Sequence, residues 1–167
     1  SVRRRAFRQR ADGARGRHIV NAIGANLLME QQRLCATPMT QWRKKTADEV
    51  YAADEVAARL AAELPQWYLE DGWIRRKYKT SGWKSTLMVV NTVGHLAEAA
   101  WHHPDLTVSY AFVTVKLMNH AAKGITEKDF ALARKIEEVL MWQPGAEPDA
   151  VLEGTPDDPR FKYLKYD

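Results

Sequence analysis

The chain has 167 residues, 46% of them hydrophobic and 28% charged, which is ordinary for one globular domain with short extensions. No run approaches 18 apolar residues, so we expect no membrane-spanning segment. The single cysteine, Cys35, cannot form an internal disulfide, and the absence of CxxC and HExxH patterns argues against a structural zinc site.

The formal net charge of +4 is unevenly distributed along the chain. Residues 1–45 hold nine Arg and two Lys against Asp12 and Glu30, a net charge of +9, and residues 46–167 have a net charge of −5. An Arg-rich, acid-poor segment without a secretory apolar core is typical of a mitochondrial transit peptide, which predicts an organellar protein; a cytoplasmic protein is the alternative. The same segment would also suit an arm that binds RNA or a large assembly, or a solvated disordered tail.

Within this basic arm, residues 18–34 place Ile19, Ile23 and Leu27 four residues apart, the spacing of an amphipathic helix. Thr37-Pro38 then breaks the pattern. We interpret residues 1–45 as a separate segment, which is either cleaved on import or used as an anchor.

A new pattern begins at Thr46, which with Glu49 three residues on predicts a capping box and a helix that ends before Pro65. The expected buried face of this helix is Val50, Val56, Leu60 and Leu64. Asp71-Gly72 is a strong hairpin turn signal between predicted strands at 67–69 and 73–79.

Residues 82–101 predict a second long helix, with a buried face expected to include Leu87, Val90, Leu96 and Ala100. Residues 105–120 are rich in β-branched and aromatic side chains and predict a strand or paired strands that bury Val113, Val115 and Leu117. Gly124 predicts a turn, and Thr126 predicts the N-cap of a final helix.

The order of elements is therefore helix, hairpin, helix, strands, helix, which predicts an α+β fold with helices packed on one face of an antiparallel sheet. We place this domain at residues 46–141. Residues 142–167 are rich in Pro, Gly and acids and end in FKYLKYD, which predicts an extended C-terminal tail whose aromatic residues dock on a neighbour.

Three histidines fall within nineteen residues at predicted element ends: His102, His103 and His120. Histidine gives and takes protons near neutral pH, which suits general acid–base chemistry. Glu98 precedes His102 by one helical turn, so we expect the two side chains to share a face. Asp129 is a second carboxylate that could orient the cluster.

Two other interpretations of the histidines stay open on composition alone. A His pair before Pro104 could cap a helix C-terminus, where an imidazolium meets the helix dipole. Three histidines could also bind zinc, although adjacent residues seldom direct two ligands to one ion and no Cys or acid beyond Glu98 has ligand spacing.

The spacing of these residues resembles the signature of the pterin-4a-carbinolamine dehydratase family. That signature is carried by Glu98-x-x-x-His102-His103-Pro104, Tyr110, His120 and Asp129. The flanking segments 64–67, 119–120 and 124–126 are similar to the family as well. The resemblance covers about residues 46–141 and leaves out the arm and the tail. Five motif elements in the right order make it specific.

The resemblance implies a four-stranded antiparallel sheet with helices on one face, assembled as a dimer or tetramer. It implies removal of water from 4a-hydroxytetrahydropterin, which gives quinonoid dihydropterin and regenerates the tetrahydrobiopterin used by aromatic amino acid hydroxylases. His102 and His120 would then be the proton-transfer pair, and His103 would bind and polarise the pterin. Glu98 and Asp129 would orient the histidines. The resemblance implies no metal and no organic cofactor.

Three residues depart from the family's usual pattern: Trp101 stands before the His pair, Asn119 before His120, and Trp83 at a position that is commonly Phe. The family also includes binding modules, among them a homeodomain dimerisation cofactor and a RuBisCO assembly factor. The alternative function is therefore a structural or assembly subunit of a large mitochondrial complex, such as a ribosome or respiratory assembly. In that case the basic arm would contact RNA, protein or an anionic membrane surface.

Overall fold

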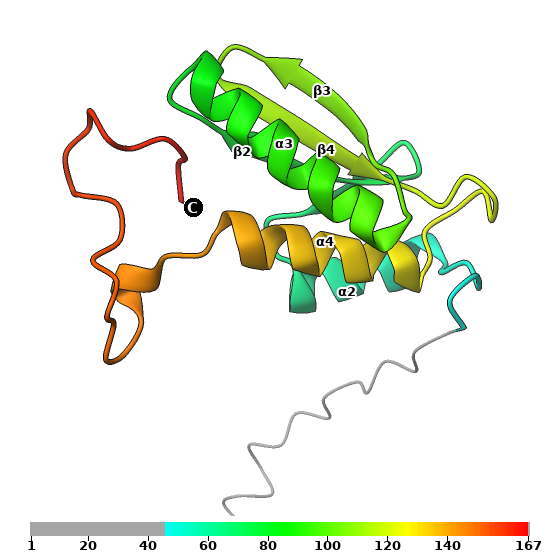
Figure 1. Ribbon diagram of the computed structural model, residues 1–167. Coiled ribbons are helices and arrows are strands. Elements are labelled where there is room, and N and C mark those ends of the chain that lie inside the picture. The colour runs from blue at the N-terminus through cyan, green and yellow to red at the C-terminus, as the bar shows by residue number, and fades with distance from the viewer. Residues whose placement is uncertain (1–45, 167) are drawn as a thin grey trace, which may run out of the picture. The chain divides into compact units, whose positions relative to one another are not determined.

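The computed structural model describes residues 46–166, so the basic arm and the predicted helix at 18–34 lie outside the described residues (Figure 1). Three α-helices, α2, α3 and α4, pack on one face of a four-stranded antiparallel sheet, as predicted. The sheet order is β1-β2-β4-β3. The elements are α2 (Ala53–Glu63), β1 (Tyr68–Glu70), β2 (Trp73–Lys79), α3 (Trp83–Ala100), β3 (Asp105–Ser109), β4 (Phe112–Leu117), α4 (Glu127–Leu140) and the short 3₁₀ helix η1 (Pro144–Ala146). No helix within this part of the chain is long and apolar enough to span a bilayer.

Buried and more exposed side chains alternate along the two central strands, β2 and β4, and the buried ones form the sheet side of the core. Val113, Val115 and Leu117 of β4 are fully buried, as the sequence predicts, and Ile74 and Tyr78 of β2 lie on the same face. The residues that alternate with them, such as Arg75 and Lys77 of β2 and Lys116 of β4, point to the opposite face. Arg76 is the polar exception on the core face, where it is buried and pairs with Glu137 of α4. The helices therefore cover a face of the sheet that is mainly apolar.

The first helix begins at Ala53 and not at Thr46, which corrects the sequence prediction. Glu49 does bond to the Thr46 backbone, but the pair closes only an isolated turn. The helix starts where the Glu55 carboxylate accepts a hydrogen bond from the Ala52 amide at 2.8 Å. Between the two turns the chain is extended, which allows Tyr51 to enter the core and to bond to the Ile125 carbonyl.

The buried face of α3 also differs from the prediction. Leu87 is 40% exposed and Ala100 is exposed, and Val90 and Leu96 are half-buried. The core side of the helix consists of Ser85, Thr86, Val89, Val93 and Ala97. Thr86 explains the shift, because its hydroxyl pairs with the Thr80 hydroxyl at 2.7 Å and donates to the Tyr110 carbonyl, which makes a polar residue a core residue.

A buried charge cluster joins α2 to α4. The Arg59 guanidinium is 2% exposed, lies 3.9 Å from the centre of the Phe130 ring and donates to Glu127 at 2.7 Å. Burial by itself would raise the pKa of Glu127, but hydrogen bonds from Arg59, Arg134 and Tyr51 outweigh it and lower this pKa to about 2. Glu127 is therefore ionised throughout the neutral range and fixes the start of α4 against α2.

The C-terminal tail docks on its own domain, and contact of its aromatic residues with a neighbour stays a prediction. Leu164 is 3% exposed and pairs with Thr80 just beyond β2. The Ser81 amide donates to the Tyr163 carbonyl and the Lys165 amide to the Lys79 carbonyl, which extends the sheet by a short segment. The tail therefore adds to the hydrophobic core instead of leaving its last residues free.

Candidate active site

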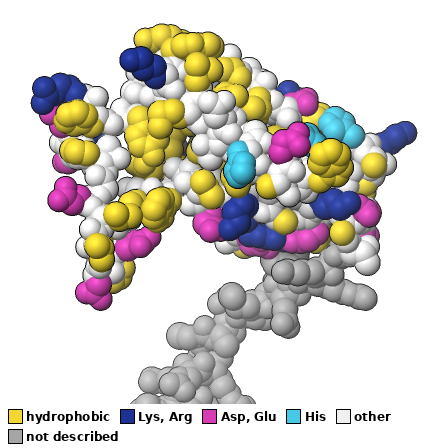
Figure 2. Space-filling view, viewed as in Figure 1, with side chains coloured by type: hydrophobic (Ala, Val, Ile, Leu, Met, Phe, Trp, Pro, Cys, Tyr) yellow, Lys and Arg dark blue, Asp and Glu magenta, His cyan; other side chains and the backbone are white. Residues whose placement is uncertain are grey.

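The three histidines emerge at one end of the sheet. Asp105, the first residue of β3, pairs with Lys116 near the end of β4, and Leu117 pairs with Ile74 at the start of β2. His102 and His103 lie just before β3 and His120 lies just after β4, so the antiparallel register brings both connections to the same edge. Figure 2 shows histidine side chains at the surface among acidic and basic neighbours.

His102 is held by a buried carboxylate. Its Nε2 lies 2.8 Å from Oδ1 of Asp129, which is completely buried, and the histidine side chain itself is 14% exposed. The other oxygen of Asp129 accepts hydrogen bonds from the Thr126 amide at 2.7 Å and from the Thr126 hydroxyl at 3.0 Å. An ionised carboxylate only accepts, so we assign the proton to Nε2 of His102, which leaves Nδ1 as the free nitrogen of the neutral ring.

The N-cap of α4 thus has two functions that the sequence did not connect. Asp129 forms a capping box with Thr126 and so fixes the start of the helix. The same carboxylate orients His102, which lies just after the C-terminal end of α3. The partner of Asp129 is therefore His102.

Glu98 pairs with His103 and not with His102, which corrects the expectation that Glu98 and His102 share one face of a helix. The distance from Nε2 of His103 to Oε1 of Glu98 is 3.3 Å, and both side chains are largely exposed. Trp101 causes the change, because its backbone adopts the left-handed conformation with φ of 50° and ends α3 before His102. The four-residue spacing from Glu98 then no longer follows a helix.

His120 has a different environment from the other two. It is exposed, and its ring meets the Trp73 ring edge-on with centroids 5.4 Å apart. Within residues 46–166, no carboxylate pairs with His120. The Trp73 ring also has a cation as a neighbour, since the ammonium group of Lys116 lies 5.5 Å from its centre.

Asn119 fixes the turn that presents His120. Its side-chain oxygen accepts from the Ala121 and Ala122 amides at 3.1 and 3.2 Å, and its backbone exchanges two hydrogen bonds with Gly124. Its amide nitrogen donates to the Thr126 hydroxyl at 3.4 Å. A continuous hydrogen-bond chain therefore runs from His102 through Asp129 and Thr126 to the turn that carries His120.

Sequence reasoning missed three of these supports: Trp73, Thr126 as a partner of Asp129, and Asn119 as the brace of the turn. Thr126 was recognised only as a helix cap and Asn119 only as a departure from a family pattern. The capping-box spacing from Thr126 to Asp129 was visible in the sequence and could have suggested their contact. Trp73 is placed by strand register, which the sequence does not specify residue by residue.

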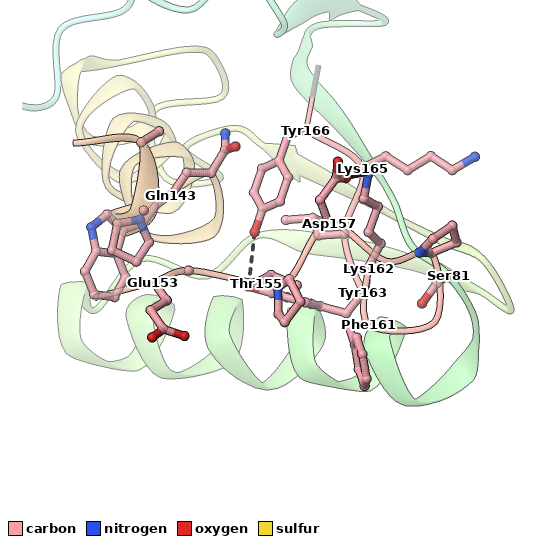
Figure 3. Close-up of a pocket in the computed structure, with 18 residues that line it drawn as sticks. Ser81, Gln143, Glu153, Thr155, Asp157, Phe161, Lys162, Tyr163, Lys165 and Tyr166 are labelled. Atoms are coloured by element: carbon pink, nitrogen blue, oxygen red, sulfur yellow. Dashed lines mark hydrogen bonds and ion pairs between the residues drawn. The ribbon is translucent and has the colours of Figure 1, made fainter. Parts of the chain in front are cut away.

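Two hollows on residues 46–166 differ in their lining, since one of them contains a histidine and the other does not. A cavity of about 530 Å³ lies between α3 and α4, lined by residues that include Trp101, His102, Lys128 and Leu132. The other, about 1310 Å³, is enclosed by the C-terminal segment and lined by aromatic residues such as Phe161, Tyr163 and Tyr166 (Figure 3). The cavity of about 530 Å³ is the one next to the histidine site, because His102 lines it. Residues 46–166 contain no cluster of His, Cys, Asp or Glu suited to a metal ion.

Comparison with known proteins identifies the family. The family model described as pterin 4 alpha carbinolamine dehydratase matches residues 49–139. A protein of Aquifex aeolicus, provisionally named a pterin-4-alpha-carbinolamine dehydratase, is 44% identical over 88 residues, covering 53% of this chain and 89% of its own. A Chloroflexus aurantiacus protein with the same provisional name is 43% identical over 86 residues, covering 52% of this chain and 91% of its own.

Among solved structures, the crystal structure of a transcriptional coactivator/pterin dehydratase from Brucella melitensis has a TM-score of 0.51 and 28% sequence identity. The match covers 55% of this chain and 98% of the Brucella chain, so the similarity extends over almost the whole of the Brucella protein. The family match spans all seven helices and strands from α2 to α4 except the last residue of α4. The chain belongs to the pterin 4 alpha carbinolamine dehydratase family.

Proposed function

We propose that this protein removes water from 4a-hydroxytetrahydropterin to give quinonoid dihydropterin. The observation that carries the proposal is the pairing of His102 with the buried Asp129, at the end of the sheet where His103 and His120 also emerge. A histidine fixed through one nitrogen presents the other to a substrate in a defined position, as general acid–base catalysis requires.

The reaction needs two proton transfers and no change of oxidation state. The bond between C4a and its hydroxyl oxygen breaks, and the oxygen leaves with the bonding electrons and takes a proton to form water. The neighbouring ring nitrogen loses its proton, and its electron pair forms the new double bond to C4a. An acid near the hydroxyl and a base near the nitrogen therefore complete the reaction, and we propose that it requires neither a metal nor an organic cofactor.

The environments of the histidines suggest how the roles divide. His102 is the base, because hydrogen bonding of Nε2 to Asp129 leaves Nδ1 with a free lone pair and stabilises the imidazolium that forms when it takes a proton. His120 is the acid, because no carboxylate in the described part of the chain occupies its ring nitrogens and it is open to solvent for reprotonation. His103, paired with the exposed Glu98, binds and polarises the pterin.

The proposal is tested with the full-length chain and chemically generated 4a-hydroxytetrahydrobiopterin, following formation of the quinonoid product by absorbance. We expect His102→Gln and His120→Gln each to lower kcat by about 10²-fold or more, the usual contribution of one general acid or base. His103→Gln should mainly raise KM. His95→Gln is the matched control, since His95 is an exposed histidine of α3 outside the site. Equal activity of all four variants and the wild type would refute the assignment.

We also propose that the basic arm, residues 1–45, determines where the enzyme is located and what it associates with. The supporting observation is the net charge of +9 in residues 1–45, against −5 in the remainder. A segment of this composition suits mitochondrial import, or anchoring to RNA, protein or an anionic membrane surface in a large organellar assembly. The catalytic domain would act there as a homo-oligomer.

Mass spectrometry of the mature N-terminus separates these two uses of the arm. A mature chain that begins after residue 17 but before the domain indicates import and cleavage. A chain that keeps the arm, and that co-sediments with a large particle in a salt-dependent manner, indicates anchoring. An uncleaved, monomeric protein in the cytoplasm would contradict both.

A further inference from the structure

Trp101 has a backbone conformation that is unfavourable for a tryptophan. It follows the last residue of α3 in the left-handed conformation, with φ of 50° and ψ of 41°. This position at a helix C-terminus favours glycine, because a β-carbon crowds the backbone there. The side chain is 80% exposed, so burial offsets little of that strain. Packing of the fold alone therefore gives no reason for a tryptophan at this point.

The indole of Trp101 lies beside the catalytic histidines. Its ring and that of His103 meet edge-on, with centroids 5.5 Å apart and planes at 76°. Trp101 also lines the 530 Å³ hollow together with His102, and the neighbouring wall is formed by the small side chains of Ala99 and Ala100. An exposed aromatic surface therefore lies next to two of the residues that handle the substrate.

The same kind of pairing recurs at the third histidine, where Trp73 meets His120 edge-on at 5.4 Å. Both exposed histidines of the site therefore have an indole as their ring neighbour. A pterin is a flat, fused, nitrogen-containing ring system. Indoles bind such rings by stacking, which needs a free aromatic face and little rearrangement.

We propose that Trp101 is a substrate-contacting residue that stacks on the pterin ring and determines substrate affinity. The proposal rests on the proposed dehydratase function and adds the residue that recognises the ring. Strain at a binding residue is a known cost of function, and it leads to an unusual expectation. Replacing Trp101 with glycine, the residue that this backbone conformation favours, should stabilise the protein and weaken substrate binding at the same time.

The experiment uses the full-length chain with Trp101→Gly, Trp101→Phe and, as a matched control, Trp83→Ala. Trp83 is the first residue of the same helix, is 49% exposed and lies at the opposite end from Trp101. For Trp101→Gly we expect Tm to rise by roughly 2 °C or more through relief of the left-handed strain. We expect KM to rise by roughly 5- to 100-fold, the loss of one aromatic stacking partner, with kcat within about twofold of wild type.

Trp101→Phe keeps an aromatic face and should recover most of the affinity, whereas Trp83→Ala should leave KM unchanged. Binding of 7,8-dihydrobiopterin, which has the fused ring but no 4a-hydroxyl, is measured in parallel by calorimetry and should weaken with KM. A wild-type protein that binds this probe but shows no dehydratase activity would overturn the proposed function and leave the stacking role standing. An active Trp101→Gly variant with unchanged KM and unchanged probe binding would overturn the stacking role alone. A fall in kcat with unchanged KM would also overturn it and would show that Trp101 only positions His103.

Discussion

Asp129→Asn changes a single atom of the site and tests how His102 is held. The carboxylate accepts one hydrogen bond from His102 and two from Thr126, and it is completely buried. An amide can offer only one oxygen. If that oxygen stays with the Thr126 donors, the NH₂ group faces Nε2 of His102, which must then become the acceptor and move its proton to Nδ1. The nitrogen that faces the substrate would lose its free lone pair.

The size of the effect follows from these contacts. Loss of a correctly placed general base is worth about 10²- to 10⁴-fold in rate, and a forced change of tautomer at a histidine–carboxylate pair has an effect of the same order. We therefore expect kcat to fall by about 10²-fold or more. If instead the NH₂ group turns toward Thr126, the buried amide and hydroxyl of Thr126 both lose their acceptor, and the free energy of unfolding falls by about 1–3 kcal/mol for each donor left unpaired.

Stopped-flow absorbance gives kcat, and urea unfolding followed by circular dichroism gives the stability. Glu98→Gln is the matched control, because Glu98 bonds to His103 at the surface and is 69% exposed, so its loss should change kcat by only a few-fold. A folded Asp129→Asn protein with wild-type kcat would show that the orientation of His102 by Asp129 is not required, and the assigned role of His102 as base would be refuted.

Three further predictions concern stability and the turn at His120. Because the folded-state pKa of Glu127 is lowered from 4.5 to about 2, its contribution to stability is complete above about pH 4.5 and is lost as the pH falls toward 2. Glu127→Gln should therefore cost about 3 kcal/mol in urea unfolding at neutral pH and leave a shallower acid transition; an unchanged acid transition would refute the pairing. Asn119→Ala leaves two turn amides without their acceptor and should lower kcat about tenfold with little change in KM, whereas a pure KM effect would contradict its bracing role. Leu164→Ala should lower the free energy of unfolding by about 2 kcal/mol without affecting kcat, and a loss of activity in the folded variant would mean that the tail supports the site.

Local patterns predicted much of the fold because their physical causes are local. Asp71 and Gly72 both adopt positive φ, at 50° and 77°, as a tight hairpin between twisted strands requires. The alternation through β4 and the capping of α4 by Thr126 also follow from neighbouring residues alone. Where these signals were strong, element type and position agree closely with the structure.

The errors came from contacts between distant residues. The buried face of α3 is shifted because Thr86 finds hydrogen-bond partners across the sheet, which no helical pattern reveals. Glu98 was expected beside His102, but the left-handed backbone of Trp101 ends the helix before it reaches His102. The contact of Asp129 with His102 and its hydrogen-bond chain to Asn119 depend on tertiary packing and could not be predicted from the spacing of these residues.

The rate of 4a-hydroxytetrahydrobiopterin dehydration by the full-length protein, compared with the spontaneous rate in the same buffer, tests the central claim most directly. The account predicts a rate that increases linearly with protein concentration and returns close to background when both His102 and His120 are replaced by Gln. A folded wild-type protein that leaves the spontaneous rate unchanged would contradict it.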